Sequence, residues 1–233
     1  MDRINTQAIV LRRTDFGEAD RIINFLTPDR GKISGLARGV RKQKSKLAGG
    51  IELFSVSDIT YLVGRGEIST LISTRLVKHY GNIVKDLDRT NTGYEIIKTI
   101  NKATEDNPEP AYFNLLVDIF TALDNELINL ELVQVWFAAQ LLRLAGHTPN
   151  LHTDESGAKL EAGQQYIFDF DSMNFHKNGS EPGSFPADNI KFLRLIFSDS
   201  NSLKTLQKVQ GVAELAATCR PLVQSMLVNH IRV

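Results

Sequence analysis

The stretch from Arg30 to Lys46 holds the densest set of residues able to bind a charged partner. Seven of its 17 residues are lysine or arginine, and none is acidic. Cations at this density displace counterions from a phosphate backbone, so the stretch predicts nucleic-acid binding that weakens steeply as salt rises. The alternative interpretation is a charged loop that is only solvated. The residues that we expect to contact DNA are Lys32, Arg38, Arg41, Lys42, Lys44 and Lys46.

Three aromatic residues near this stretch are candidates for stacking on bases. Phe16, Phe54 and Tyr61 each present a ring on which an unpaired base stacks, although any of them is also explained as a core residue. The basic stretch carries charge rather than a pattern that reads base edges. We therefore expect binding that tolerates many sequences.

Two further groups of residues raise the question of catalysis or metal binding. Asp15, Glu18 and Asp20 cluster between two predicted strands, where a short acidic loop is usually only solvated. In the second group, His147, His152, Asp154 and His176 offer nitrogen and oxygen ligands, but their spacing matches no zinc signature. We interpret both groups as surface loops and predict no metal and no cofactor.

Covalent and nucleotide-dependent catalysis lack candidates in the sequence. The single cysteine, Cys219, lies on a predicted apolar helix face, where a buried structural thiol is favoured over a nucleophile. Neither a phosphate-cradling G-x-x-x-x-G-K-[ST] loop nor a G-x-S-x-G elbow occurs. We expect a protein that is not an enzyme.

The charges are distributed unevenly along the chain. Residues 1–85 hold 15 Lys and Arg against 8 Asp and Glu, whereas residues 86–233 hold 12 against 19, so a segment of charge +7 precedes one of −7. Such asymmetry indicates a domain that faces nucleic acid joined to one with another task. No run of about 20 apolar residues is present, and the amino terminus does not resemble a signal peptide. We expect a cytoplasmic, nucleoid-associated protein without a membrane span.

The elements that must position these residues change character near residue 82. Short β-favouring runs occupy most of residues 4–80, including an alternating apolar pattern from Ile51 to Val63. Five short strands without a covering helix predict a closed barrel of the oligonucleotide-binding (OB) type over residues 1–82, and an SH3-like barrel stays an alternative.

Residues 83–233 show helical periodicity and predict an all-α second domain, so the fold class is α+β with two domains. The segment Asn107–Pro110 separates two predicted helices. Residues 130–144 are expected to form an almost wholly apolar central helix. An irregular excursion rich in glycine and proline spans about 147–186 and shows at best one short strand pair, around Tyr166 to Phe170. Pro221 is expected to end or kink the last helix.

Residues 8–54 resemble the opening of the RecO family of bacterial recombination mediators. The resemblance is carried by the run AIVLRRTDFGEADR from Ala8 and continues through LTP from Leu26, GKIS from Gly31, ARGVRK from Ala37, KLAG from Lys46 and ELF from Glu52. Further on, LLRLAGHTPNL from Leu141 is similar to the end of the family's central helix and the turn that follows it. Between these blocks the likeness is mainly one of pattern.

This resemblance implies an amino-terminal OB fold, a helical second domain, and a role in annealing DNA strands and loading recombinase. It also implies binding to single- and double-stranded DNA, to RecR, and to the acidic C-terminal tail of single-strand-binding protein, for which the sequence indicates no residues. Family DNA contacts carry over onto the matching positions Lys32, Arg38, Arg41, Lys42 and Lys46. Many relatives carry four zinc-binding cysteines after the turn, whereas this chain has none of them in residues 152–157.

Two competing functions stay open at the level of sequence. The basic stretch of a protein-interaction adaptor would dock an acidic partner instead of nucleic acid, which the charge asymmetry allows equally well. A hydrolase would use Asp154, Glu155 and the neighbouring histidines with an added metal. Competition by free oligonucleotide and metal-binding calorimetry separate these alternatives from the leading one.

Overall fold

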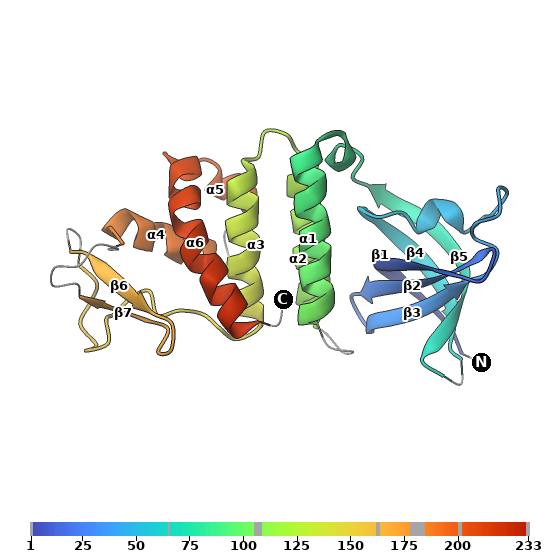
Figure 1. Cartoon of the computed structure of the whole chain (residues 1–233), viewed down its shortest axis with the longest axis horizontal. Coiled ribbons are helices and arrows are strands. Elements are labelled where there is room, and N and C mark those ends of the chain that lie inside the picture. Colours follow the sequence, from blue (N-terminus) through green and yellow to red (C-terminus); the bar gives the residue numbers. More distant parts are fainter. Residues whose placement is uncertain are drawn as a thin grey trace. The chain divides into compact units, whose positions relative to one another are not determined.

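The first five strands form one sheet that closes on itself as a barrel (Figure 1). A computed structural model of the chain describes residues 2–64, 66–104, 109–161, 164–177, 185–199 and 202–231. The strands are β1 (Arg3–Phe16), β2 (Asp20–Thr27), β3 (Gly31–Ala37), β4 (Ser55–Leu62) and β5 (Ile68–His79). Their order is β1-β2-β3-β5-β4, and β1 pairs with both β2 and β4. The barrel closes through a short parallel pairing of β3 with β5.

Alternating residues of these strands fill the barrel, together with Val40 and Ile51 from the segment between β3 and β4. The core consists of Ala8, Val10, Ile23, Phe25, Ala37, Val40, Ile51, Ile59, Tyr61 and Leu71. The sequence predicts an extended strand from Ile51, but the observed strand β4 begins only at Ser55. The reason is that Phe54 adopts a left-handed backbone (φ 54°). Arg65, in the turn predicted between β4 and β5, lies outside the described residues.

The Phe54 ring packs beside helix α1 (Leu87–Ala103) and helix α2 (Pro110–Leu123). Its centroid lies 5.3 Å from that of Tyr94 and 5.5 Å from that of Phe120, both in edge-to-face geometry. Gly93 makes room for it, since a β-carbon there would come within 2.5 Å of Phe54 Cε1. The left-handed turn therefore moves one aromatic side chain from the strand to the helices.

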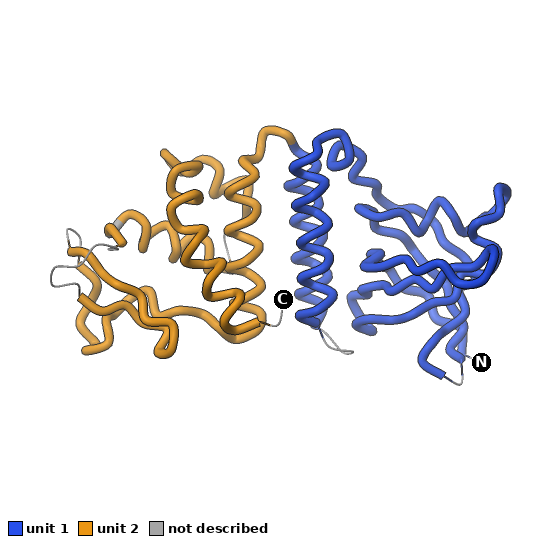
Figure 2. Tube along the Cα trace, in the orientation of Figure 1, with its two compact units in different colours: residues 1–125 blue, residues 126–233 orange. Residues whose placement is uncertain are grey.

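Residues 1–125 form one compact unit, which holds the barrel together with α1 and α2 (Figure 2). Helix α1 begins after Asp86, whose side chain accepts the backbone N–H of Arg89 at 2.9 Å. Helix α2 begins at Pro110, as a proline in a first turn allows; Asn107 and Pro108 lie outside the described residues. The unit extends past residue 82, where the sequence places a domain boundary, and that boundary stays a prediction.

The second compact unit, residues 126–233, is mainly helical. It contains α3 (Leu130–Leu144), α4 (Ala187–Ile196), α5 (Leu203–Leu206) and α6 (Val212–His230). Helix α3 is buried on most of its surface, as its apolar sequence predicts, and it packs against α6. Of the two expectations for Pro221, the end of the helix is wrong, because α6 continues to His230, and the kink stays a prediction. Burial of Leu222, Val223, Met226 and Leu227 offsets the lost backbone hydrogen bond.

The prediction of an all-α second domain is also wrong in one respect. A two-stranded sheet of β6 (Tyr166–Asp169) and β7 (Asn174–Lys177) lies within the predicted excursion of residues 147–186. Tyr166 and Phe175 are fully buried there and make an edge-to-face contact, so a small apolar core supports the hairpin. The short strand pair that the sequence indicated around Tyr166 to Phe170 is therefore present, with its second strand further along the chain than expected.

Candidate nucleic-acid interface

Residues 38–46, which we call the basic loop, follow β3 and lead toward β4. The side chains of Arg38, Arg41, Lys42, Lys44 and Lys46 are all exposed. Val40, between the first two of them, is 5% exposed and belongs to the barrel core. The loop is therefore held at its centre by a buried valine while its cations face solvent.

Backbone hydrogen bonds give the basic loop a defined shape. The N–H of Lys42 donates to the carbonyl of Gly39 at 3.1 Å, and the N–H of Ser45 donates to the carbonyl of Lys42 at 3.0 Å. Gly39 has φ +62°, a conformation that favours glycine. At the far end, the hydroxyl of Thr74 in β5 donates to the carbonyl of Leu47 at 3.0 Å. Successive turns fixed at both ends thus present the cations.

The turn between β1 and β2 fastens the start of this loop. Asp20 Oδ1 accepts the backbone N–H of Gly39 at 2.7 Å, and the carbonyl of Ala19 accepts the N–H of Arg41 at 2.9 Å. The guanidinium of Arg41 lies 3.5 Å from Asp15 Oδ2. Asp15 and Asp20, which the sequence presented as a candidate acidic site, therefore position the cations.

Asp15 lies between two arginines. Arg21 Nε donates to Asp15 Oδ1 at 2.7 Å, and this hydrogen bond, followed by the charge of Arg41, lowers the pKa of the Asp15 carboxyl below its usual value. The carboxylate stays ionised and keeps its hold on Arg41 over the whole neutral range. Because the group is exposed, salt screens this pairing.

Lys32 lies apart from the other predicted contacts. It sits near the start of β3, five residues before Ala37, so strand geometry places it about 17 Å along the sheet from the end of the strand, where the loop begins. Its Nζ donates to the carbonyl of Asn101 in the last turn of α1 at 3.1 Å, where a cation complements the helix dipole. The structure thus gives Lys32 a partner within the protein, and its DNA contact stays a prediction.

The three candidate stacking residues have different environments. Phe16, at the end of β1, is 52% exposed and stays a candidate. Phe54 and Tyr61 are only 1% and 3% exposed, so the stacking interpretation is wrong for both. Alternation along a strand predicts which residues share a face but does not say which face lies inside a barrel.

The residues considered for catalysis or metal binding make contacts that support the fold. Burial raises the pKa of the Cys219 thiol to about 12, which leaves the sulfur protonated and unreactive. Asp154 Oδ1 accepts from the Ser156 hydroxyl at 2.6 Å and from two backbone N–H groups, so it holds a turn together. His147 stacks on His230 with centroids 4.9 Å apart. Among the residues that the structure describes, no three His, Cys, Asp or Glu side chains gather as metal ligands.

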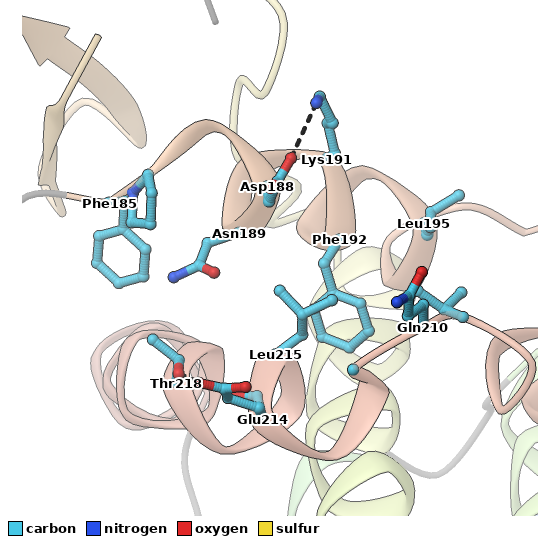
Figure 3. A pocket seen from close by; sticks show the side chains of 13 residues that line it. Phe185, Asp188, Asn189, Lys191, Phe192, Leu195, Gln210, Glu214, Leu215 and Thr218 are labelled. Atoms are coloured by element: carbon cyan, nitrogen blue, oxygen red, sulfur yellow. Dashed lines mark hydrogen bonds and ion pairs between the residues drawn. The ribbon is translucent and has the colours of Figure 1, made fainter. Parts of the chain in front are cut away.

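The second unit contains a cavity of about 840 Å³ between α4 and α6 (Figure 3). Phe192 and Leu215 give it an apolar wall, and Asp188 and Glu214 lie at its edge. Its one lysine, Lys191, already pairs with Asp188 at 2.9 Å. This charge balance does not favour an acidic peptide.

A small closed barrel with an ordered basic loop, followed by a mainly helical unit, defines the class of this protein. Two family models match it: "Recombination protein O N terminal" over residues 1–80 and "Recombination protein O C terminal" over residues 84–233. The chain belongs to the RecO family, which confirms the resemblance seen in its sequence.

Similar proteins carry the name "DNA repair protein RecO". One from Dehalococcoides mccartyi strain 195 is 37% identical over 147 residues, covering 63% of this chain and 57% of the relative. One from Desulfatibacillum aliphaticivorans is 33% identical over 154 residues, covering 65% and 60%. One from Streptomyces griseus is 38% identical over 117 residues, covering 48% and 47%. The chain thus spans about three-fifths of the length of the first two.

No helix within the described parts of the chain is long and apolar enough to cross a membrane. The predicted cytoplasmic, nucleoid-associated location stays a prediction.

Proposed function

We propose that this chain is a DNA-binding mediator of recombinational repair that acts without catalysing a reaction of its own. It binds single- and double-stranded DNA, anneals complementary strands and helps to load recombinase on single strands covered by single-strand-binding protein. The observation that carries the proposal is the basic loop, where five exposed cations stand on a backbone held by the β1–β2 turn. The name "DNA repair protein RecO" of the similar proteins supports the same role.

The barrel supports this proposal through its topology. A five-stranded barrel in the order β1-β2-β3-β5-β4 is typical of the OB fold, and we assign the barrel to that class. OB folds bind nucleic acid across strands 2 and 3 and through the loop between strands 1 and 2. Here Ala19 lies in that first loop, and Asp15 and Asp20 lie at the strand ends that flank it. These three residues hold the basic loop. The cations therefore lie beside the surface that this fold uses for binding.

The chemistry of the loop favours backbone contacts over base reading. Lysine and arginine on a solvated loop attract phosphates of any sequence, and Phe16 next to it offers a ring to an unpaired base. Sequence-tolerant binding is what annealing requires, because any complementary pair must be accepted. Single strands leave bases free to stack, so we expect them to be preferred.

The protein partners in this proposal are RecR and the acidic tail of single-strand-binding protein. The acidic edge of the cavity between α4 and α6 does not suit that tail, and we assign no residues to either partner.

Fluorescence anisotropy with a labelled single-stranded oligonucleotide between about 50 and 300 mM salt tests the DNA contact. The variant Arg38→Gln/Lys42→Gln/Lys44→Gln neutralises three loop cations and leaves Arg41 bound to Asp15. Each phosphate contact on a single strand contributes about 0.7 to the slope of the logarithm of the binding constant against the logarithm of the salt concentration. The variant should therefore lower this slope by about 2 in magnitude and weaken annealing in parallel. The matched control, Lys159→Gln/Lys204→Gln/Lys208→Gln, removes three exposed charges from the second unit and should bind as the unmodified protein does.

Two outcomes would contradict the proposal. Equal binding by the loop variant and the control would remove the loop from the interface. Binding of an acidic protein partner that free oligonucleotide does not displace, together with absent DNA binding, would establish the adaptor function instead.

A further inference from the structure

A cleft within the first unit lies between β1 and α1. It has a volume of about 630 Å³ and an apolar floor of Leu11, Leu53 and Ile97. Four cations line it, Arg12 and Arg13 from β1 and Lys98 and Lys102 from α1, against the single carboxylate of Glu95. We call this feature the β1–α1 cleft. Its excess of positive charge arises from residues about 90 positions apart in the chain.

Two of these cations are available for a ligand. Arg13 pairs with Glu52 at 3.0 Å, and Lys98 lies 3.6 Å from Glu95. Arg12 and Lys102 are exposed, and neither forms an ion pair with any other described residue. The cleft therefore has one unpaired cation on each wall.

The cleft also contains an exposed aromatic ring. Tyr94 lies on the α1 wall, is 47% exposed, and is held edge-to-face by the buried Phe54. A fixed ring beside unpaired cations suits a nucleotide, whose base stacks while its phosphate meets the charge. An acidic peptide would use the cations but has no equivalent need of the ring.

The same strand connects the cleft to the basic loop. Arg13 lines the cleft, and Asp15, two residues further along β1, contacts Arg41 of the basic loop. Side chains two apart on a strand point to the same side and lie about 7 Å apart. The basic loop and the mouth of the cleft therefore lie close together along β1.

We infer that the β1–α1 cleft continues the DNA-binding surface, with Arg12 and Lys102 contacting the phosphates of a single strand that leaves the basic loop and Tyr94 stacking on one of its bases. This inference rests on the proposed function and deepens it by adding contacts on a helix outside the barrel. Lys32 has a place in this arrangement, since its bond to Asn101 fixes the end of α1 that carries Lys102.

The test uses the full chain and a single-stranded oligonucleotide of about 25 bases containing bromodeoxyuridine. The cleft variant Arg12→Gln/Lys102→Gln removes two phosphate contacts. It should therefore lower the slope of the logarithm of the binding constant against the logarithm of the salt concentration by about 1.4 in magnitude, at about 0.7 for each contact. Irradiation of the unmodified protein should crosslink Tyr94, as located by mass spectrometry. The control Lys204→Gln/Lys208→Gln removes the same charge from the second unit and should change neither readout.

The results separate this inference from the proposed function. If the loop variant loses binding while the cleft variant keeps the full salt dependence and Tyr94 is not crosslinked, the function stands and the cleft is excluded. If the cleft variant instead loses binding of an acidic peptide with DNA binding unchanged, the cleft is a protein-docking site and the inference is overturned. If the unmodified protein binds no DNA, both fail together.

Discussion

Asp20 accepts the backbone N–H of Gly39 at 2.7 Å, which joins the β1–β2 turn to the glycine of the basic loop across 19 positions of sequence. An acidic residue thereby supports a surface whose proposed ligand is an anion. Its negative charge opposes that ligand, so its presence beside the loop is explained by geometry rather than by electrostatic attraction.

Replacing the Asp20 carboxylate distinguishes its effect on the shape of the basic loop from the effect of its negative charge on DNA binding. Asp20→Ala removes a negative charge, which by electrostatics alone would strengthen DNA binding. We expect binding weakened several-fold, because the loop loses its first anchor, and stability lowered by about 1 kcal/mol for the lost hydrogen bond. Anisotropy and hydrogen exchange over residues 38–46 measure the two effects.

Asp20→Asn is the control for that variant, since its amide oxygen still accepts from Gly39. It should bind DNA at least as tightly as the unmodified protein. Tighter binding by Asp20→Ala, with unchanged exchange in the loop, would show that Asp20 does not position the cations.

Acid should release the Asp15 anchor only at low pH. The pKa of this carboxyl is lowered in the folded protein, so its contribution to stability is present above the unfolded value of 3.8 and is lost as pH falls through the lower folded value. NMR titration of the carboxyl should give a midpoint below 3.8, and Arg21→Gln should raise it more than Arg41→Gln does, because the Arg21 hydrogen bond is the larger cause. Equal midpoints in all three proteins would remove the arginines as the cause.

The free energy of unfolding should depend on the size of residue 93, because this residue lies against the Phe54 ring. In Gly93→Ala the new β-carbon would lie 2.5 Å from Phe54 Cε1, so the ring or the helix must shift. The overlap costs about 1–3 kcal/mol, partly offset by about 1 kcal/mol of helix propensity, and Gly93→Val should cost more. Urea unfolding measures this series.

A glycine without close neighbours provides the comparison. A β-carbon at Gly49 would meet nothing within 4 Å, so Gly49→Ala should leave the free energy of unfolding nearly unchanged. Equal effects at positions 49 and 93 would argue against the packing of Phe54 as the reason for Gly93.

Cys219 should be unreactive in the folded protein. Its pKa of about 12 and its burial leave almost no accessible thiolate at pH 8. A chromogenic disulfide reagent should label it only after urea is added, and Cys219→Ser should be less stable than Cys219→Ala because it buries a more polar group. Rapid labelling of the native protein would contradict this.

The sequence predicted those features that depend on local pattern. The helical period indicated α3, and composition alone located the basic loop. It missed features that depend on distant partners: Arg12 and Lys102 meet only because α1 lies beside β1, and Asp15 and Asp20 are recognised as supports only once Gly39 and Arg41 are seen next to them. For Phe54 and Tyr61 the sequence left stacking and core packing open, because it gives no sign of the left-handed turn or of the face that lies inside the barrel.

Val40 lies in the barrel core while its neighbours Arg38 and Arg41 face solvent, so the loop acquires its order when the barrel folds. Under the proposed function, DNA meets a loop whose backbone is already ordered, so that backbone should lose little conformational freedom on association. Arg41 is tied to Asp15, whereas no ion pair holds Arg38, Lys42 or Lys44 among the described residues. Under the proposed function, removing one of these three cations should weaken DNA binding by one phosphate contact without altering the path of the chain.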